Sequence, residues 1–497
     1  MRYRLGIALI IAPLVGAGAQ SAAPQLAPVS LSITEALARA DSVSEAVGIA
    51  RAGVNQAEAN RQRAKSWRLP QLNGSASYSR TIESQFSDFA SSGVSDSIPA
   101  PIDCSRYTPI PDAPIGIRVD SLERGLDCTA NGSGVDFSTL PFGRPNTYNF
   151  GLSLSQSVFN PVIGAQVSAA VAGRDAADQG LVGEKTRAVL NMAQGYFDAQ
   201  LADRLVEITD STLAQAERAY EQTRLEKSVG NVAEFDLLRA TVSRDNQRRA
   251  VIQRRAARDR AFVRLRQLLN LPSATPLTLT TPLGDSTHAA LPPSMAPSAS
   301  DTSIAARVPV RQATAELRAS EAQFRAARDA RLPTLALSST YAKIGFPEQV
   351  FGLNSFVTDW FVMLRMDVPL YTGGRLRAEA FGAEAAREAA ALRLRYAQKQ
   401  ADREATDASS DLIAAEAVWA ASDGTAELAA RAYQIAEVRY QNGLSTLTDL
   451  GDVRIQLQVA QANRALAARD LQVTRVRSAL LRDLPFGTAI QAGAGSL

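Results

Sequence analysis

Residue types that carry out catalysis are scarce in this chain. It contains a single histidine, His288, which lies in a Pro-rich stretch between two longer patterned regions. A Ser-His-Asp set cannot be built around a histidine in such a linker. No pair of carboxylates stands out on a strand, no phosphate-binding loop is present, and one histidine makes a metal site improbable. We therefore expect a protein that is not an enzyme and that binds no cofactor and no metal.

Two carboxylates nevertheless have a spacing that could serve a function. Asp449 and Asp452 lie three residues apart in a segment that reads as a helix, so both side chains lie on one face, one turn apart. The alternatives are two solvated surface acids, or an acidic pair that stabilises the start of a helix through its dipole.

The first residues indicate export. Residues 1–19 read as a signal peptide, in which Arg2 and Arg4 precede an apolar run from Leu5 to Leu14 and a small-residue cleavage site follows. The run is shorter than the roughly 20 residues that a membrane-spanning helix needs. No later stretch is long and uncharged enough to span. Because no cysteine stands at the cleavage point, we expect no N-terminal lipid anchor.

The remaining composition limits the partners. The net charge of +3 over 497 residues is nearly balanced, which argues against a nucleic-acid surface. The only cysteines, Cys104 and Cys128, fall in one polar segment. In an exported chain we expect them to form a disulfide, with two free thiols as the alternative.

The chain contains an internal repeat. An Arg-Leu-Pro tripeptide precedes an alternating segment at 68–70 and again at 331–333. An Ala-Tyr pair occurs ten residues before Gly230 and again ten residues before Gly443, and these glycines are 213 residues apart. Repetition of this kind predicts two similar halves.

Each half should contain a helix, two strands and a helical hairpin. The expected parts are a first repeat at 20–270, a Pro/Ser/Thr-rich linker at 271–303, a second repeat at 304–484 and a tail at 485–497. Ser32 and Glu35 form a capping-box pattern, which predicts one helix from there to about Trp67. Hairpin tips are expected near residues 230 and 443, and a long polar loop at 80–145.

Four segments alternate between apolar and small polar residues, as strands with two different faces do. They lie at 72–79, 148–158, 335–341 and 360–368. Each is long enough to cross a bilayer as a tilted strand, but four strands cannot close a barrel. Open edges in hydrocarbon would cost several kcal/mol for each unpaired backbone group. We therefore expect chains to share one barrel, of eight strands for two chains or twelve for three. The alternative is a soluble sheet with its Ser/Asn face toward solvent.

The segment after the last strand carries a distinctive motif, Asp-Val-Pro-Leu-Tyr-Thr-Gly-Gly-Arg at 367–375. It resembles the strand-to-helix junction of TolC-like outer-membrane efflux proteins, in which Gly373 and Gly374 permit a sharp turn without Cβ clashes. The first half departs from this pattern, with Phe-Asn-Pro at 159–161. Segments 229–238 and 440–450 resemble the two helix–turn–helix tips of the same family.

The resemblance implies a mainly α fold with a β-barrel contribution, built from duplicated long-helix and two-strand units. Three chains would form a twelve-stranded barrel in the outer membrane, continued by an α-helical tunnel in the periplasm. The expected partners are a periplasmic adaptor protein, an inner-membrane pump and outer-membrane lipid, and no nucleic acid. The implied function is export of small molecules such as drugs or other toxic compounds. The duct of a type I protein secretion system is the alternative, and a purely structural periplasmic coiled coil is disfavoured by the strands.

The resemblance also implies roles for single residues. Asp449 and Asp452 correspond by position to the aspartate rings of the pore constriction, where rings of negative charge favour cations. Asp236 and Tyr440 correspond to the contact that holds neighbouring helices together in the resting gate. Ser445 stands where some members carry an arginine, so the gate is expected to be looser or closed by other contacts.

The tips are expected to receive the adaptor. The residues in this role are Val229, Gly230, Gly443 and Leu444.

Overall fold

The computed structural model describes residues 28–82, 104–132, 146–284, 303–347 and 356–488. The predicted signal peptide and His288 lie outside the described residues. The chain divides into two compact units, the first made of residues 1–55, 175–315 and 392–497 and the second of residues 56–174 and 316–391.

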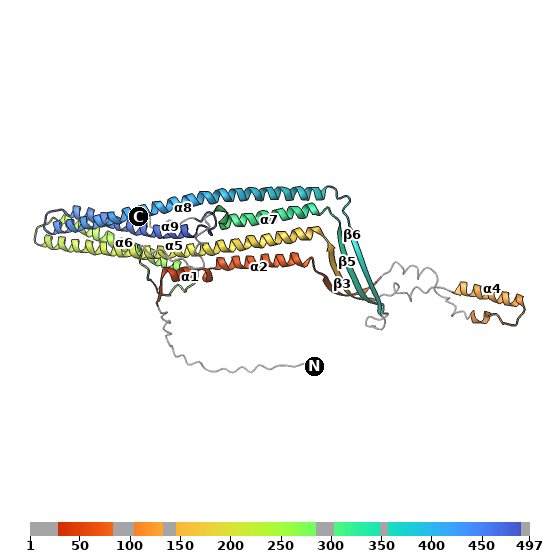
Figure 1. Cartoon of the computed structure of the whole chain (residues 1–497). Helices are drawn as coiled ribbons and strands as arrows, with labels where there is room; N and C mark the ends of the chain where they lie inside the picture. The colour runs from red at the N-terminus through yellow and green to blue at the C-terminus, as the bar shows by residue number, and fades with distance from the viewer. Residues whose placement is uncertain (1–27, 83–103, 133–145, 285–302, 348–355, 489–497) are drawn as a thin grey trace, which may run out of the picture. The chain divides into compact units, whose positions relative to one another are not determined.

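Most of the described chain is helical (Figure 1). The α-helices are α1 (Ile33–Val43), α2 (Glu45–Ser66), α4 (Ile115–Gly132), α5 (Pro161–Ser228), α6 (Glu234–Leu268), α7 (Val308–Asp329), α8 (Arg375–Gln441) and α9 (Leu447–Leu480). Short 3-10 helices are η1 (Cys104–Tyr107) and η3 (Ile304–Ala306). Helices α5 and α8 have 68 and 67 residues. At about 1.5 Å per residue each is roughly 100 Å long, far beyond an ordinary globular helix.

The second unit contains the four strands that the alternating segments predict. They are β2 (Gln71–Arg80), β3 (Asn146–Phe159), β5 (Thr334–Gly345) and β6 (Phe356–Asp367). They form one antiparallel sheet in the order β2-β3-β5-β6. Among the described strands, β2 and β6 therefore each have one edge without a partner.

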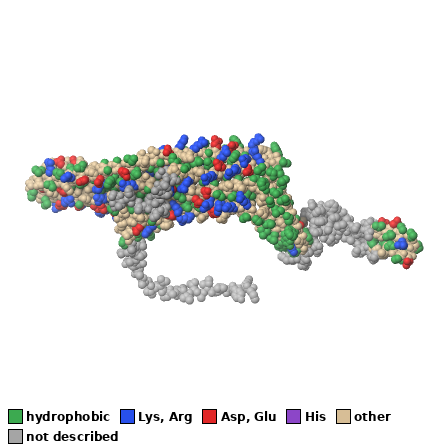
Figure 2. Space-filling model, viewed as in Figure 1, with side chains coloured by type: hydrophobic (Ala, Val, Ile, Leu, Met, Phe, Trp, Pro, Cys, Tyr) green, Lys and Arg blue, Asp and Glu red, His purple; other side chains and the backbone are tan. Residues whose placement is uncertain are grey.

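The register of the sheet keeps its two faces distinct. Leu152 of β3 pairs with Tyr341 of β5, which in turn pairs with Trp360 of β6, so the apolar face is continuous across strands. The other face carries small polar pairs such as Ser153 with Thr340. Apolar side chains on the sheet are exposed, and Figure 2 shows hydrophobic side chains gathered over these strands.

The strands lead into helices by two different turns. Before α8, Gly373 and Gly374 have φ of +60° and +88°, which residues with a Cβ rarely adopt. Before α5, the side chain of Asn160 accepts a hydrogen bond from the Val162 amide at 3.1 Å, and Pro161 occupies the first helical position. An Asn cap followed by proline is a favourable helix start that needs no glycine pair.

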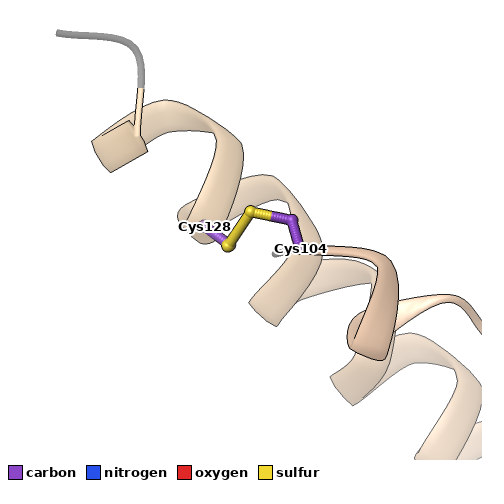
Figure 3. The surroundings of a disulfide bond; sticks show 2 residues. All are labelled: Cys104 and Cys128. Atoms are coloured by element: carbon purple, nitrogen blue, oxygen red, sulfur yellow. A yellow bond between two sulfur atoms is a disulfide. The ribbon is translucent and has the colours of Figure 1, made fainter. Parts of the chain in front are cut away.

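The expectation of an uninterrupted loop at 80–145 is wrong, because η1 and α4 lie within it. Cys104 of η1 and Cys128 of α4 are joined by a disulfide, with their Cα atoms 6.0 Å apart (Figure 3). The helical signal is the apolar spacing from Ile115 to Leu126, which recurs every three or four residues among glycines and acids. Residues 83–103 and 133–145 lie outside the description.

The expectation of one helix from Ser32 to Trp67 is also wrong. The predicted capping box between Ser32 and Glu35 is present, but the chain becomes extended at Ser44, between α1 and α2. Just before the break, Ser42 donates to the carbonyl of Arg39 at 2.9 Å. Serine side chains compete with helical backbone bonds in this way, which makes a helix boundary favourable.

The first unit has a core that sequence patterns do not reveal. Two three-residue strands, β1 (Val29–Leu31) and β4 (Leu277–Leu279), pair in parallel within the expected lead-in and linker. Leu31 is fully buried, and its carbonyl accepts a hydrogen bond from the Tyr196 hydroxyl at 3.0 Å. Leu190 and Phe197 of α5 belong to the same core.

No helix in the described part of the chain is long and apolar enough to cross a membrane.

Candidate functional site at the helical tips

The two helical hairpins of the first unit turn in the same way. After α5, the amide of Gly230 donates to Lys227 and that of Asn231 to Glu226, both at 3.0 Å. After α8, the amide of Gly443 donates to the carbonyl of Tyr440, three positions before, and that of Leu444 to the carbonyl of Arg439, five positions before. This is the Schellman pattern, which requires a left-handed residue after the helix. Gly230 and Gly443 supply it, with φ of +83° and +70°.

The predicted docking residues at these turns are exposed. Val229 and Leu444 are 69% and 68% exposed, and a Cβ placed at Gly230 or Gly443 would meet nothing within 4 Å. The glycines are therefore needed for backbone conformation and not for space. Each turn presents one exposed apolar side chain, Val229 at the first and Leu444 at the second.

The second tip is closed by a capping box at the start of α9. The Thr446 amide and hydroxyl donate to one carboxylate oxygen of Asp449, at 3.0 and 2.8 Å. In return the Asp449 amide donates to the Thr446 hydroxyl oxygen at 3.2 Å. These two bonds to the carboxylate hold the pKa of Asp449 below its usual range.

The two predicted constriction acids have different surroundings. Asp449 is exposed and stabilises the start of α9. This is the role that the sequence analysis gave the acidic pair as an alternative to lining a pore. Its charge is retained in that task, so capping and ring formation are compatible. Asp452 is exposed one turn further along α9, on the same face.

The predicted gate tyrosine has another partner in this chain. The hydroxyls of Tyr440 and Thr223 lie 3.0 Å apart, within hydrogen-bond distance. Burial raises the pKa of Tyr440, and the nearby charge of Asp236 adds to that rise. Asp236 thus acts on Tyr440 through its field, while Thr223 provides the direct contact between α5 and α8.

Ser445, which stands at the position of the arginine link, makes no such contact here. Its Oγ is buried and has no hydrogen-bond partner among the described residues. The two hairpins are instead joined by other polar contacts. Arg454 of α9 donates to the Ser243 hydroxyl of α6 at 2.6 Å, and Arg239 of α6 donates to Thr448.

A small apolar cluster supports these contacts. It is formed by the buried side chains of Ala219, Tyr433, Leu450 and Leu457. Burial, together with the charge of Glu437, raises the pKa of Tyr433 to about 12, so its hydroxyl stays protonated and donates to Glu437 at 3.2 Å. Burial likewise lowers the pKa of Arg454. The tip is thus held by packed tyrosines and by hydrogen bonds between side chains.

Sequence reasoning missed Thr223, Arg239 and Arg454. These residues come from different helices, and their meeting depends on helix register. The capping box of α9 does have a signal in the sequence, because Thr446 and Asp449 have the required spacing. Among the described residues no group of His, Cys, Asp and Glu could hold a metal ion.

Solved structures with the same architecture define the class of fold. CusC superposes with a TM-score of 0.67 at 19% identity, over 93% of this chain and 95% of that one. The Campylobacter jejuni CmeC outer membrane channel gives 0.68 at 16% identity, over 92% and 87%. The fold is thus that of outer-membrane channels, with a strand region joined to long helical hairpins.

The sequence itself matches a family. Residues 125–271 and 300–480, about two thirds of the chain, match the outer membrane efflux protein family. Nodulation protein T of Rhizobium leguminosarum bv. viciae is 24% identical over 315 residues, which are 62% of this chain and 63% of that protein. The chain thus matches less than two thirds of that relative's length. The chain belongs to the outer membrane efflux protein family.

Proposed function

We propose that three copies of this chain form an export channel, which passes small molecules from an inner-membrane pump and a periplasmic adaptor to the exterior. The observation that carries this proposal is the four-stranded sheet with two unpaired edges and an exposed apolar face. A sheet with this surface needs hydrocarbon on one face and further strands at both edges. Threefold pairing of β2 with β6 of the next copy would close twelve strands around a lumen.

The dimensions and surface of the strands support a membrane location. β5 and β6 have 12 residues each. At about 3.4 Å per residue and a tilt of about 45°, each would rise roughly 29 Å, close to the hydrocarbon thickness of a bilayer. Aromatic pairs lie on the apolar face, with the rings of Tyr78 and Tyr148 4.9 Å apart and those of Tyr341 and Trp360 6.4 Å apart. Such residues favour membrane interfaces.

The helical tips would form the periplasmic end. We propose that Asp449 and Asp452 of three copies line the constriction, where their charges favour cations. Tyr440, with Thr223 and the field of Asp236, would hold the resting gate. The exposed Val229 and Leu444, presented by the turns at Gly230 and Gly443, would receive the adaptor. The repeat boundaries at 20–270 and 304–484 belong to the same proposal, since each repeat supplies one tip.

The tip glycines provide a direct test of the docking role. Gly443→Val forces a β-branched residue to positive φ and should abolish dye efflux from intact cells, whereas Gly443→Asn, which tolerates that conformation, should retain most of it. The amount of trimer in the outer-membrane fraction is measured in parallel for both variants. Normal efflux by Gly443→Val would contradict the docking role of this tip.

A further inference from the structure

The apolar face of the sheet carries two charged side chains among the described strand residues, and both are basic. Strand alternation and the pairing register place Arg80 of β2 and Lys343 of β5 on this face. Asp359, Arg365 and Asp367 of β6 lie on the polar face, where Arg365 and Asp367 pair at 3.0 Å. Arg80 and Lys343 have no salt bridge within the described chain. The apolar face therefore presents positive charge that no described carboxylate on that face neutralises.

Lys343 lies close to the end of the sheet that is not joined to the long helices. β2 and β5 follow helices at their first residues, and β3 and β6 lead into helices at their last. The opposite end of the sheet is therefore formed by Arg80, Asn146, Gly345 and Phe356. Lys343 is two residues from that end, so at about 3.4 Å per residue and a tilt of about 45° its backbone would lie roughly 5 Å inside it. A lysine side chain can span that depth.

A hollow lies beside Lys343 on the same face. Its volume is about 690 Å³, and its lining includes Ala76, Phe150, Leu152, Tyr341, Lys343 and Phe356. The hollow exists because β2 contributes the small residues Gly74 and Ala76 opposite the large side chains of Leu152 and Phe150. The lining is thus largely apolar, and the lysine supplies its charge.

Two phenylalanine rings border Lys343 in this hollow. Phe150 is the cross-strand partner of Lys343, and the centroid of its ring lies 5.8 Å from that of Phe356. The rings can meet across β5 because Gly345 has no side chain, since a Cβ there would lie 2.8 Å from the Phe356 ring. The aromatic pair gives the methylene stem of Lys343 an apolar surface along which to reach the headgroup region, as amphipathic side chains do at interfaces.

We propose that this hollow binds a phosphorylated lipid of the outer leaflet, with an acyl chain against the apolar lining and the phosphate on Lys343. The inference rests on the proposed function, which puts the long helices in the periplasm and this end of the sheet in the outer leaflet. Basic residues at headgroup level attract anionic lipids, and a lysine ammonium binds phosphate as a point charge. A soluble anion is a poorer match, because it would leave the apolar lining exposed to water.

Native mass spectrometry of the full-length trimer in detergent, titrated with lipid A, tests the site. We expect up to three lipid A molecules to be retained by each trimer of the parent chain. Lipid A from which the phosphates have been removed should bind about tenfold more weakly, since it loses a charge-assisted hydrogen bond. This comparison uses the parent chain alone, so it does not depend on the folding of a variant.

Substitutions then locate the contact. Lys343→Gln should raise the dissociation constant for lipid A about tenfold, whereas Lys343→Arg should retain binding. Ala76→Phe keeps the charge but fills the hollow, and it should weaken binding as well. Arg80→Gln is the matched control, because it removes a positive charge from the same face outside the hollow.

Three results would overturn the proposal: equal retention of lipid A with and without its phosphates, equal retention by Lys343→Gln and the parent chain, or a loss in Arg80→Gln as large as that in Lys343→Gln. The last would indicate a general attraction to basic residues at the sheet end. If trimers form but hold no lipid A, the lipid site alone is wrong. If no trimer forms, the proposed function is contradicted as well.

Discussion

At the level of single residues, the carboxylate of Asp449 caps a helix and is also proposed to line the constriction. It caps α9 through two hydrogen bonds from Thr446, and these bonds lower its pKa. Because the folded pKa lies below the unfolded value, the cap is at full strength above the ordinary Asp pKa. It is lost as the pH falls through the folded pKa. The same shift keeps the proposed ring charged at mildly acidic pH.

This shift predicts how ion selectivity depends on pH. We expect the cation preference of the reconstituted channel to persist as the pH falls to about 4, near the ordinary Asp pKa, and to decline only below it. Thr446→Ala removes the hydroxyl donor and should move that decline upward, whereas Thr446→Ser should not. Reversal potentials in a salt gradient measure both. Unchanged selectivity in an Asp449→Ala/Asp452→Ala double variant would remove these acids from the constriction.

Loss of the cap should also be visible in stability. Thr446→Ala is expected to weaken the first turn of α9 by about 1 kcal/mol, the usual cost of losing a threonine N-cap. Hydrogen exchange of the Asp449 and Leu450 amides measures this loss, with Gln456→Ala, at an exposed position further along α9, as the control. Equal protection in Thr446→Ala and the parent chain would show that the cap contributes nothing.

At the level of helices, α5 and α9 are joined by a buried ion pair. Arg469 is fully buried and lies 2.6 Å from Asp198, yet burial outweighs the arginine and raises the pKa of Asp198. The attraction of Arg469 therefore mainly compensates for the free-energy cost of burying the Asp198 carboxylate, and it adds little net stability. Removing it leaves that charge buried without its cation.

We therefore expect Arg469→Ala to destabilise the protein by about 3–5 kcal/mol, as for other broken buried pairs. Arg464→Ala is the control, because Arg464 and Asp423 form an exposed pair at 2.6 Å, a kind worth about 0–1 kcal/mol. The denaturant midpoint of the purified protein measures both. Similar midpoints for the two variants would contradict the buried-pair account.

The helices, strands and turns also show how much of the fold the sequence alone predicts. Alternation revealed all four strands of the sheet, and the glycines at 230, 443 and 373–374 marked turns that require positive φ. The pairing of β1 with β4 was not predicted, because three residues are too few for a periodic pattern and the two strands are distant in the sequence. The contact between Thr223 and Tyr440 was not predicted for a related reason. The two residues are 217 positions apart, and their contact depends on the register between two helices.

For the whole molecule, the central claim concerns how many chains complete the sheet. In the described part of one chain, the sheet of the second unit has four strands and two open edges, and lipid does not tolerate open edges. Three chains would satisfy both edges of every sheet and enclose a lumen wide enough for solutes.

Native mass spectrometry of the protein extracted from outer membranes in detergent tests this claim most directly. We expect one dominant species with the mass of three mature chains, which persists when the detergent is changed. A species of a single chain, or of two, would leave the strand edges unpaired or the lumen filled, and would contradict the channel described here.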